Sequence, residues 1–112
     1  MKYGLKESTI QRINAVFARH PQIQKVVLYG SRAKGSFKNG SDIDLTLRGR
    51  ESLTPEVLSK ILHELDELLL PYTIDLSLYA QIQDPDVLDH IKRVGIIFYK
   101  KEGGNLESKK RS

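Results

Sequence analysis

The fold of this chain is decided by residues 25–47, which read KVVLYGSRAKGSFKNGSDIDLTL. Residues 25–29 form an apolar, β-branched run that is typical of a buried strand. In residues 42–47, polar residues alternate with isoleucine and leucine, which is the period of a half-buried strand. We therefore predict two strands joined by a loop at residues 30–40, with one helical turn that begins near Ser31.

The sequence on either side of this unit predicts helices and further strands. Apolar residues at helical spacing, each series ended by a proline or a glycine, predict helices over about residues 8–19, 54–70 and 84–94. Short alternating or apolar runs predict strands at residues 73–79 and 96–99. The expected fold class is α/β (α+β), with a single mixed sheet of about four strands and helices mainly on one face.

The length of 112 residues is enough for one compact domain, which we place at residues 1–100. The formal net charge is +4, and residues 100–112, with five basic and two acidic side chains, hold most of it. The basic tail, residues 101–112, is predicted to be solvated and disordered, with contact to RNA or to an acidic partner as the alternative. Because the rest of the chain is close to neutral, its charge gives no reason to infer direct nucleic-acid binding.

The chain contains no cysteine, which excludes disulfides, thiolate catalysis and zinc–sulfur sites. It has no run of about 18 apolar residues that could span a membrane. The first residues, MKYG, lack the apolar region of a signal peptide. We therefore expect a cytoplasmic protein without a membrane contact.

Three aspartates stand at matching positions of the two alternating strands. Asp42 and Asp44 are separated by one residue, so they emerge on one side of their strand about 6–7 Å apart. A neighbouring strand could bring Asp75 within about 5 Å of one of them. Clustered carboxylates repel one another, and bound Mg²⁺, which prefers oxygen ligands, would offset that cost. A single aspartate after a loop is more simply a turn residue, but the three together predict a metal site.

The loop between the first two strands supplies groups that suit phosphates. Gly30 allows a tight turn at the end of the first strand, and Ser31 offers a hydroxyl at a helix start. Arg32, Lys34 and Lys38 are close enough in sequence to neutralise phosphate charge, although each could equally be a plain surface cation. We predict that Gly30, Ser31, Arg32 and Lys34 bind the phosphates of a nucleotide.

These two motifs resemble those of a known family. Residues 30–35, GSRAKG, followed by residues 41–45, SDIDL, resemble the minimal nucleotidyltransferases (MNT family) of the DNA polymerase β superfamily. The resemblance covers about residues 26–78 and implies the polymerase-beta-like nucleotidyltransferase fold. Lys34 stands where many members carry arginine, and lysine lacks the bidentate fork of a guanidinium group.

The resemblance also implies roles for the residues singled out above. In this family the turn that matches Gly30 and Ser31 binds the nucleotide phosphates. The acids that match Asp42 and Asp44 coordinate two Mg²⁺ ions, and the acid that matches Asp75 helps to bind metal and to activate the acceptor hydroxyl. The implied reaction is transfer of a nucleoside monophosphate, AMP from ATP, to a hydroxyl group.

The acceptor is suggested by the family and by the short chain, which offers a catalytic half-cleft and little else. Minimal members are similar to antitoxins that adenylylate a tyrosine of a neighbouring HEPN ribonuclease. The leading hypothesis is therefore a protein adenylyltransferase that acts as antitoxin to a HEPN-type toxin. One alternative is a transferase for a small hydroxyl substrate, completed by a partner or a homodimer. Another is a non-catalytic antitoxin that acts by binding alone.

The remaining polar aromatic residues carry little functional signal. His20, His63 and His90 lie on or beside predicted helices without ligand-like spacing, so surface or helix-end roles are favoured. Tyr29 and Tyr79 border the predicted site and could stack on a base, or could equally pack at its rim.

Overall fold

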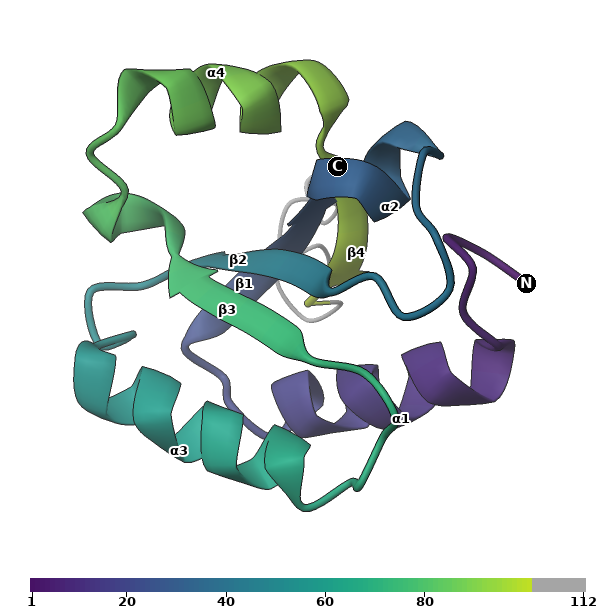
Figure 1. Ribbon diagram of the computed structural model, residues 1–112. Helices are drawn as coiled ribbons and strands as arrows, with labels where there is room; N and C mark the ends of the chain where they lie inside the picture. Colours follow the sequence, from purple (N-terminus) through teal and green to yellow (C-terminus); the bar gives the residue numbers. More distant parts are fainter. Residues whose placement is uncertain (102–112) are drawn as a thin grey trace, which may run out of the picture.

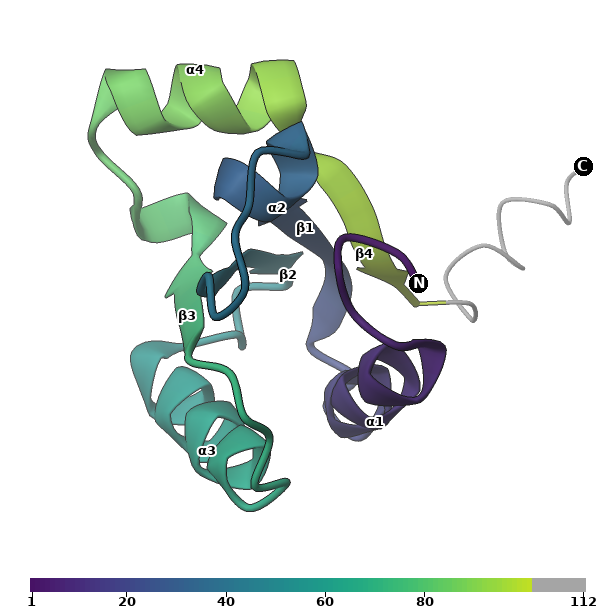
Figure 2. The same ribbon diagram turned by 45° about the vertical axis from the view of Figure 1, so that its right-hand side comes forward.

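The computed structural model describes residues 1–101 as a four-stranded sheet packed between helices (Figures 1 and 2). The predicted mixed α/β fold with four strands is confirmed. Apart from Lys101, the predicted basic tail lies outside the described residues. The helices are α1 (Glu7–Ala18), α2 (Gly30–Lys34), α3 (Pro55–Asp66) and α4 (Pro85–Val94), and a 3₁₀ turn, η1, spans Tyr79–Gln81. The strands are β1 (Ile23–Tyr29), β2 (Ile43–Gly49), β3 (Ile74–Leu78) and β4 (Ile96–Lys100).

The order of strands in the sheet is β3-β2-β1-β4. β1 is antiparallel to both β2 and β4, whereas β2 and β3 are parallel and are joined by a crossover through α3. A parallel pair needs such a crossover because its second strand must begin at the same end as its first. The start of β3 therefore lies beside the start of β2.

The two faces of the sheet are covered differently. α1 and α3 lie side by side against one face, where apolar residues of both helices pack on apolar residues of the strands (Figures 1 and 2). α2 and α4 lie on the other side of the sheet, so helices cover both faces and not mainly one face as the sequence predicts. α4 packs against β1, and the middle of that face is closed, since Val27 is 8% exposed and Thr46 is 0% exposed. The two ends of this face are left for polar side chains.

The end of α3 differs from the sequence prediction. The apolar spacing predicts a helix to about residue 70, but the helix ends at Asp66. Leu69 has a positive φ of 54° and is 87% exposed, so the backbone reverses where the apolar pattern continues. The amide N–H groups of Leu68 and Leu69 bond to carbonyls of the last turn of α3, which ends the helix. Within residues 1–101, no helix is long and apolar enough to cross a membrane.

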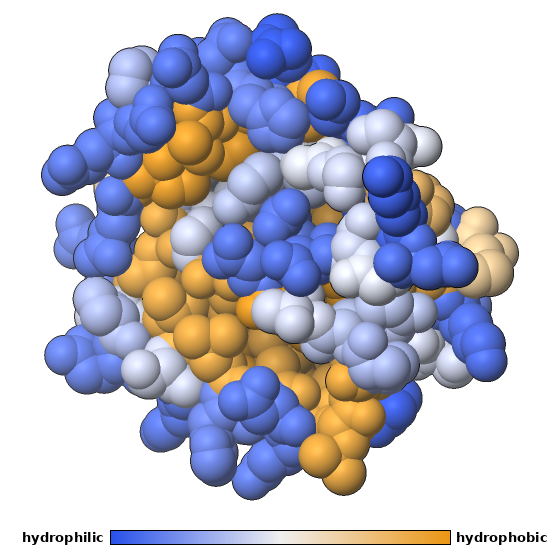
Figure 3. Space-filling model, viewed as in Figure 1, coloured by the Kyte–Doolittle hydropathy of each residue, from blue (hydrophilic) through white to orange (hydrophobic). Residues whose placement is uncertain are grey.

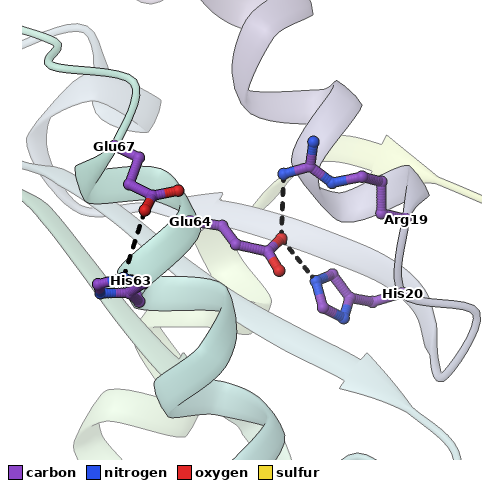
Figure 4. Close-up of polar contacts among 5 residues, drawn as sticks. All are labelled: Arg19, His20, His63, Glu64 and Glu67. Atoms are coloured by element: carbon purple, nitrogen blue, oxygen red, sulfur yellow. Dashed lines mark hydrogen bonds and ion pairs between the residues drawn. The ribbon is translucent and has the colours of Figure 1, made fainter.

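A polar contact fixes α3 against the end of α1 (Figure 4). Glu64 accepts a bond from Arg19 at 3.1 Å and lies 2.9 Å from Nε2 of His20, which is 9% exposed. The hydrogen bond with His20, together with Arg19, lowers the pKa of Glu64. A lowered carboxyl pKa stabilises the fold above the unfolded pKa, and this stabilisation is lost as the pH falls through the folded pKa.

Replacing Glu64 with glutamine is therefore expected to lower the free energy of unfolding at neutral pH, by at most about 1 kcal/mol because solvent screens the pair. The difference from the natural chain should disappear under acid conditions. Thermal denaturation as a function of pH measures it. Glu67→Gln is the matched control, because Glu67 pairs with His63 while both side chains are at least 67% exposed. Equal behaviour of the two variants would contradict the argument.

Candidate active site

The end of the sheet beside α2 brings a tyrosine and two carboxylates into one row. Tyr29 of β1 pairs with Asp44 of β2, and Asp44 pairs with Asp75 of β3. Asp42 precedes β2 by one residue and is exposed. Paired residues on neighbouring strands point to the same side, so the register places Asp44 and Asp75 next to each other, as the alternation of the sequence predicts. In the view of Figure 3, hydrophilic residues gather over the strands below α2 and α4, with hydrophobic residues beside them.

The electrostatics of the row follow from burial and like charge. Burial raises the pKa of Asp44, and the carboxylates of Asp75 and Asp42 raise it further, whereas His90 lowers it. Burial is also the main cause that raises the pKa of Tyr29, to which Asp75 and Asp44 add. The site therefore disfavours its own negative charge, and a bound cation would relieve this cost.

The three carboxylates suit Mg²⁺ by the chemistry of their donor atoms. Asp42, Asp44 and Asp75 offer only carboxylate oxygens, which are hard ligands of the kind that Mg²⁺ shares with phosphates. Within residues 1–101, no three acidic or histidine side chains stand close enough to form a ready metal site. A closer approach of the three carboxylates would increase the like charge that, after burial, raises the pKa of Asp44.

The turn after β1 lies against Asp44. Gly30 has a φ of +77°, and a Cβ atom on it would overlap Oδ2 of Asp44. Ser31, half-buried, follows in the first turn of α2, where its carbonyl accepts the N–H groups of Gly35 and Ser36. The structure thus brings the predicted phosphate turn, Gly30 and Ser31, to the least exposed of the three predicted site carboxylates. Only glycine fits at position 30, because it combines a positive φ with this close approach.

Arg32 is directed into the protein. Its side chain is 3% exposed and donates to the carbonyls of Ser41, at 2.8 and 3.2 Å, and of Tyr3, at 2.8 Å. The guanidinium carbon also lies 5.2 Å from the ring centre of Phe37 and 5.1 Å from that of Tyr72. The predicted contact of Arg32 with nucleotide stays a prediction. The geometry shows that Arg32 holds the backbone of Ser41, the residue before Asp42, in place.

Substitution of Arg32 with alanine is expected to destabilise the fold by about 3 kcal/mol, because two partly buried carbonyls lose their donor and the buried side chain leaves a cavity. Arg32→Lys should cost less, since the charge stays while the fork of donors is lost. Thermal denaturation gives the loss of stability, and titration with ATP gives the affinity. A role limited to nucleotide binding would instead weaken ATP affinity and leave the melting temperature unchanged.

The other predicted cations of the loop face solvent. Lys34, in the last turn of α2, and Lys38 are both exposed. The backbone N–H of Lys38 donates to Oγ of Ser41 at 2.8 Å, which shapes the approach to Asp42. A phosphate contact by Lys34 therefore stays a prediction. The side chain of Lys34 is exposed, so it is free of the packing that holds Arg32 inside the protein.

His90 lies at the site, which the sequence did not indicate. Its Nε2 accepts a hydrogen bond from the backbone N–H of Gly30 at 3.1 Å. Its ring meets Tyr29 edge-on, with centroids 6.2 Å apart. Because Nε2 accepts, the proton of the neutral ring lies on Nδ1. The prediction of a surface or helix-end role for His90 is wrong: 60 residues after Gly30, the histidine anchors the phosphate turn to α4.

Comparisons with known proteins agree with this geometry. The family model described as "Polymerase beta, Nucleotidyltransferase" matches residues 11–103. A solved toxin–antitoxin structure with AMP-PNP is similar with a TM-score of 0.65 and 19% identity, over 89% of this chain and 77% of that one. A complex of tri-AMPylated Shewanella oneidensis HEPN toxin with MNT antitoxin is similar with a TM-score of 0.63 and 15% identity, over 90% and 77% of the two chains.

At these identities the solved structures show the shared fold alone. The comparison with curated proteins gave no match. The family model covers most of the chain, and it includes the glycine–serine turn and all three carboxylates. The chain therefore belongs to the polymerase beta nucleotidyltransferase family.

Proposed function

We propose that this chain transfers AMP from ATP to a tyrosine hydroxyl of a HEPN-type toxin and so acts as its antitoxin. The observation that carries the proposal is the register of Asp44 with Asp75 beside the Gly30 turn, which places a predicted phosphate turn next to a pair of carboxylates. The fold shared with an MNT antitoxin in complex with an AMPylated HEPN toxin supports the choice of acceptor. The fold shared with a toxin–antitoxin structure that contains AMP-PNP supports the adenine nucleotide.

Each residue of the site has a proposed role in this transfer. The turn at Gly30 and Ser31 holds the phosphates, and the bond from Gly30 to His90 keeps that turn against α4. Mg²⁺ bound by Asp42, Asp44 and Asp75 would supply the positive charge that the phosphates and the carboxylates need. Magnesium dependence is part of the proposal.

The reaction forms a bond between the acceptor oxygen and the α-phosphorus and breaks the bond from that phosphorus to the bridging oxygen of the β-phosphate. The proton of the hydroxyl passes to Asp75, which is exposed and therefore open to the acceptor. Pyrophosphate leaves with the electrons of the broken bond. Asp44, which is more buried than Asp75 and lies against Gly30, is on the side of the site where the nucleotide phosphates bind.

The proposal is tested by incubating the chain with the HEPN-type protein encoded beside it, Mg²⁺ and ATP labelled at the α-phosphate. Label is expected on a tyrosine of the partner, and the partner's ribonuclease activity should fall in parallel. Omission of Mg²⁺ should abolish both effects.

A double variant, Asp42→Ala/Asp44→Ala, separates catalysis from binding. The variant should still bind the partner but leave it unlabelled and active. Inhibition that persists in this variant, with no label on the partner in any reaction, would show an antitoxin that acts by contact alone. Label on a small molecule instead of the partner would assign the chain to small hydroxyl substrates.

A further inference from the structure

Five cations line a hollow at the end of the sheet opposite the carboxylates. The hollow has a volume of about 490 Å³ and lies where β1 begins and β2 and β4 end. Three of the cations are in register across neighbouring strands, because Lys25 pairs with both Arg48 and Lys100. Like charges in such a row destabilise a sheet unless an anion lies among them. We call this pocket the basic hollow; its five cations are Lys25, Arg48, Arg50, Lys100 and Lys101.

No carboxylate of residues 1–101 forms an ion pair with the basic hollow. Two of its cations are nevertheless held in place. The Arg48 guanidinium lies over the ring of Tyr79, 4.2 Å from the ring centre. The Nζ atom of Lys101 donates to the carbonyl of Pro21 at 3.1 Å. These contacts position positive charge without neutralising it, so the hollow is complementary to an anionic partner.

The lining favours carboxylates of a protein over a nucleic acid. Among residues 1–101, Gln24 and Gly49 complete the lining of the hollow, so this part of the chain offers no aromatic ring to a base there. The nearby ring of Tyr79 is already covered by Arg48. Single-stranded RNA gains much of its affinity from bases stacked on aromatic side chains. Acidic side chains need only the cations.

The hollow is also within reach of a protein that occupies the active site. Arg48 is four residues beyond Asp44 on β2 and points to the same side, so the two lie about 13 Å apart along the strand. A protein interface of ordinary size covers about 800 Å² on each partner, which is roughly 30 Å across. α4 packs against α2 and β1, so the part of this face on β2, from Asp44 to Arg48, lies beside that helix.

We propose that the basic hollow is the docking site for an acidic surface segment of the acceptor protein. The acidic residues of that segment lie about 13 Å from the hydroxyl that is modified. The identity of the acceptor rests on the proposed function, whereas the anionic chemistry of the segment rests on the hollow itself.

The test uses a variant that reverses one charge in the middle of the row, Lys25→Glu. Glutamate at position 25 would lie between Arg48 and Lys100, so the variant should keep or raise the melting temperature. Lys60→Glu, on the exposed side of α3, changes the net charge equally and is the matched control. Fluorescence anisotropy at low ionic strength measures binding of a labelled octaglutamate peptide and of a uridine dodecamer.

The natural chain and Lys60→Glu are expected to bind octaglutamate equally, whereas Lys25→Glu should bind it about tenfold more weakly. In the transfer reaction, Lys25→Glu should raise the KM for the acceptor protein and leave the KM for ATP unchanged. If the chain transfers no nucleotide, the peptide measurement still tests whether the basic hollow binds acidic side chains. Equal peptide binding by all three chains would overturn the proposal. Tighter binding of the RNA, lost in Lys25→Glu, would overturn it in favour of a nucleic acid.

Discussion

Replacing Asp44 with asparagine is expected to lower AMP transfer about a thousandfold and to raise the melting temperature. The rate falls because a charged ligand of the reacting phosphate site is worth several kcal/mol in the transition state. The melting temperature rises, by roughly 2–5 °C, because asparagine keeps the shape of the side chain and removes both a partly buried charge and its repulsion from Asp75 and Asp42.

The pH dependence of this gain has a definite sign. A carboxyl whose pKa is raised in the folded chain destabilises the fold above that pKa, and the cost vanishes below the unfolded pKa. The stability gap between Asp44→Asn and the natural chain should therefore be full at neutral pH and shrink in acid. Calorimetry in metal-free buffer measures the gap. Added Mg²⁺ should stabilise the natural chain and leave the variant unchanged.

Asp66→Asn serves as the control for charge alone, since Asp66 is an exposed residue at the end of α3. It should change neither transfer nor melting temperature by a measurable amount. A loss of stability in Asp44→Asn would contradict the argument from charge repulsion. Transfer close to the natural rate would show that Asp44 has no role in the reaction.

Substituting Gly30 with alanine is expected to reduce transfer about a hundredfold. The new Cβ would overlap Oδ2 of Asp44 and push the carboxylate away from the phosphate turn. Displacement of a catalytic group by about 1 Å can cost two orders of magnitude in rate. The positive φ of +77° adds strain of about 1–2 kcal/mol, which thermal denaturation should detect.

Gly35→Ala separates the backbone strain from the displaced carboxylate. Gly35 has a similar φ of +85°, and in residues 1–101 no atom outside its own stretch of backbone lies within 4 Å of the Cβ that would be added. This variant should lose similar stability at the end of α2 but keep most of the transfer rate. Equal loss of activity in the two variants would show that the strain, and not Asp44, explains the effect.

The pairing of Asp44 with Asp75 beside the glycine turn could be predicted from the sequence because strand alternation fixes the side on which a residue emerges. Asp44 and Asp75 hold the same position in two strands of alternating pattern. When these strands pair with their apolar residues in register, the two carboxylates lie side by side. His90 could not be predicted, because its bond to Gly30 depends on how α4 crosses the sheet. No local pattern in the sequence encodes that crossing.

Arg32 and Leu69 show two other limits of sequence reasoning. A cation beside a phosphate turn suggests a ligand, but aromatic rings brought in from Phe37 and Tyr72 make a buried place for the guanidinium. Leu69 continues the apolar spacing of α3, yet its backbone turns into the left-handed region and exposes the side chain. In both cases tertiary contacts, and not local preference, decide the outcome.

The strand order also determines when the site forms during folding. β1 and β2 are antiparallel and are closed by residues 30–42, whereas β3 joins β2 only after the longer crossover of residues 50–73. Parallel pairs with long connections tend to form late, so we expect Asp44 to meet Gly30 before it meets Asp75. Asp75→Asn should therefore slow unfolding and leave the folding rate unchanged, which denaturant-dependent kinetics would measure. That result would mean that the carboxylate pair shortens the lifetime of the folded chain without delaying its formation.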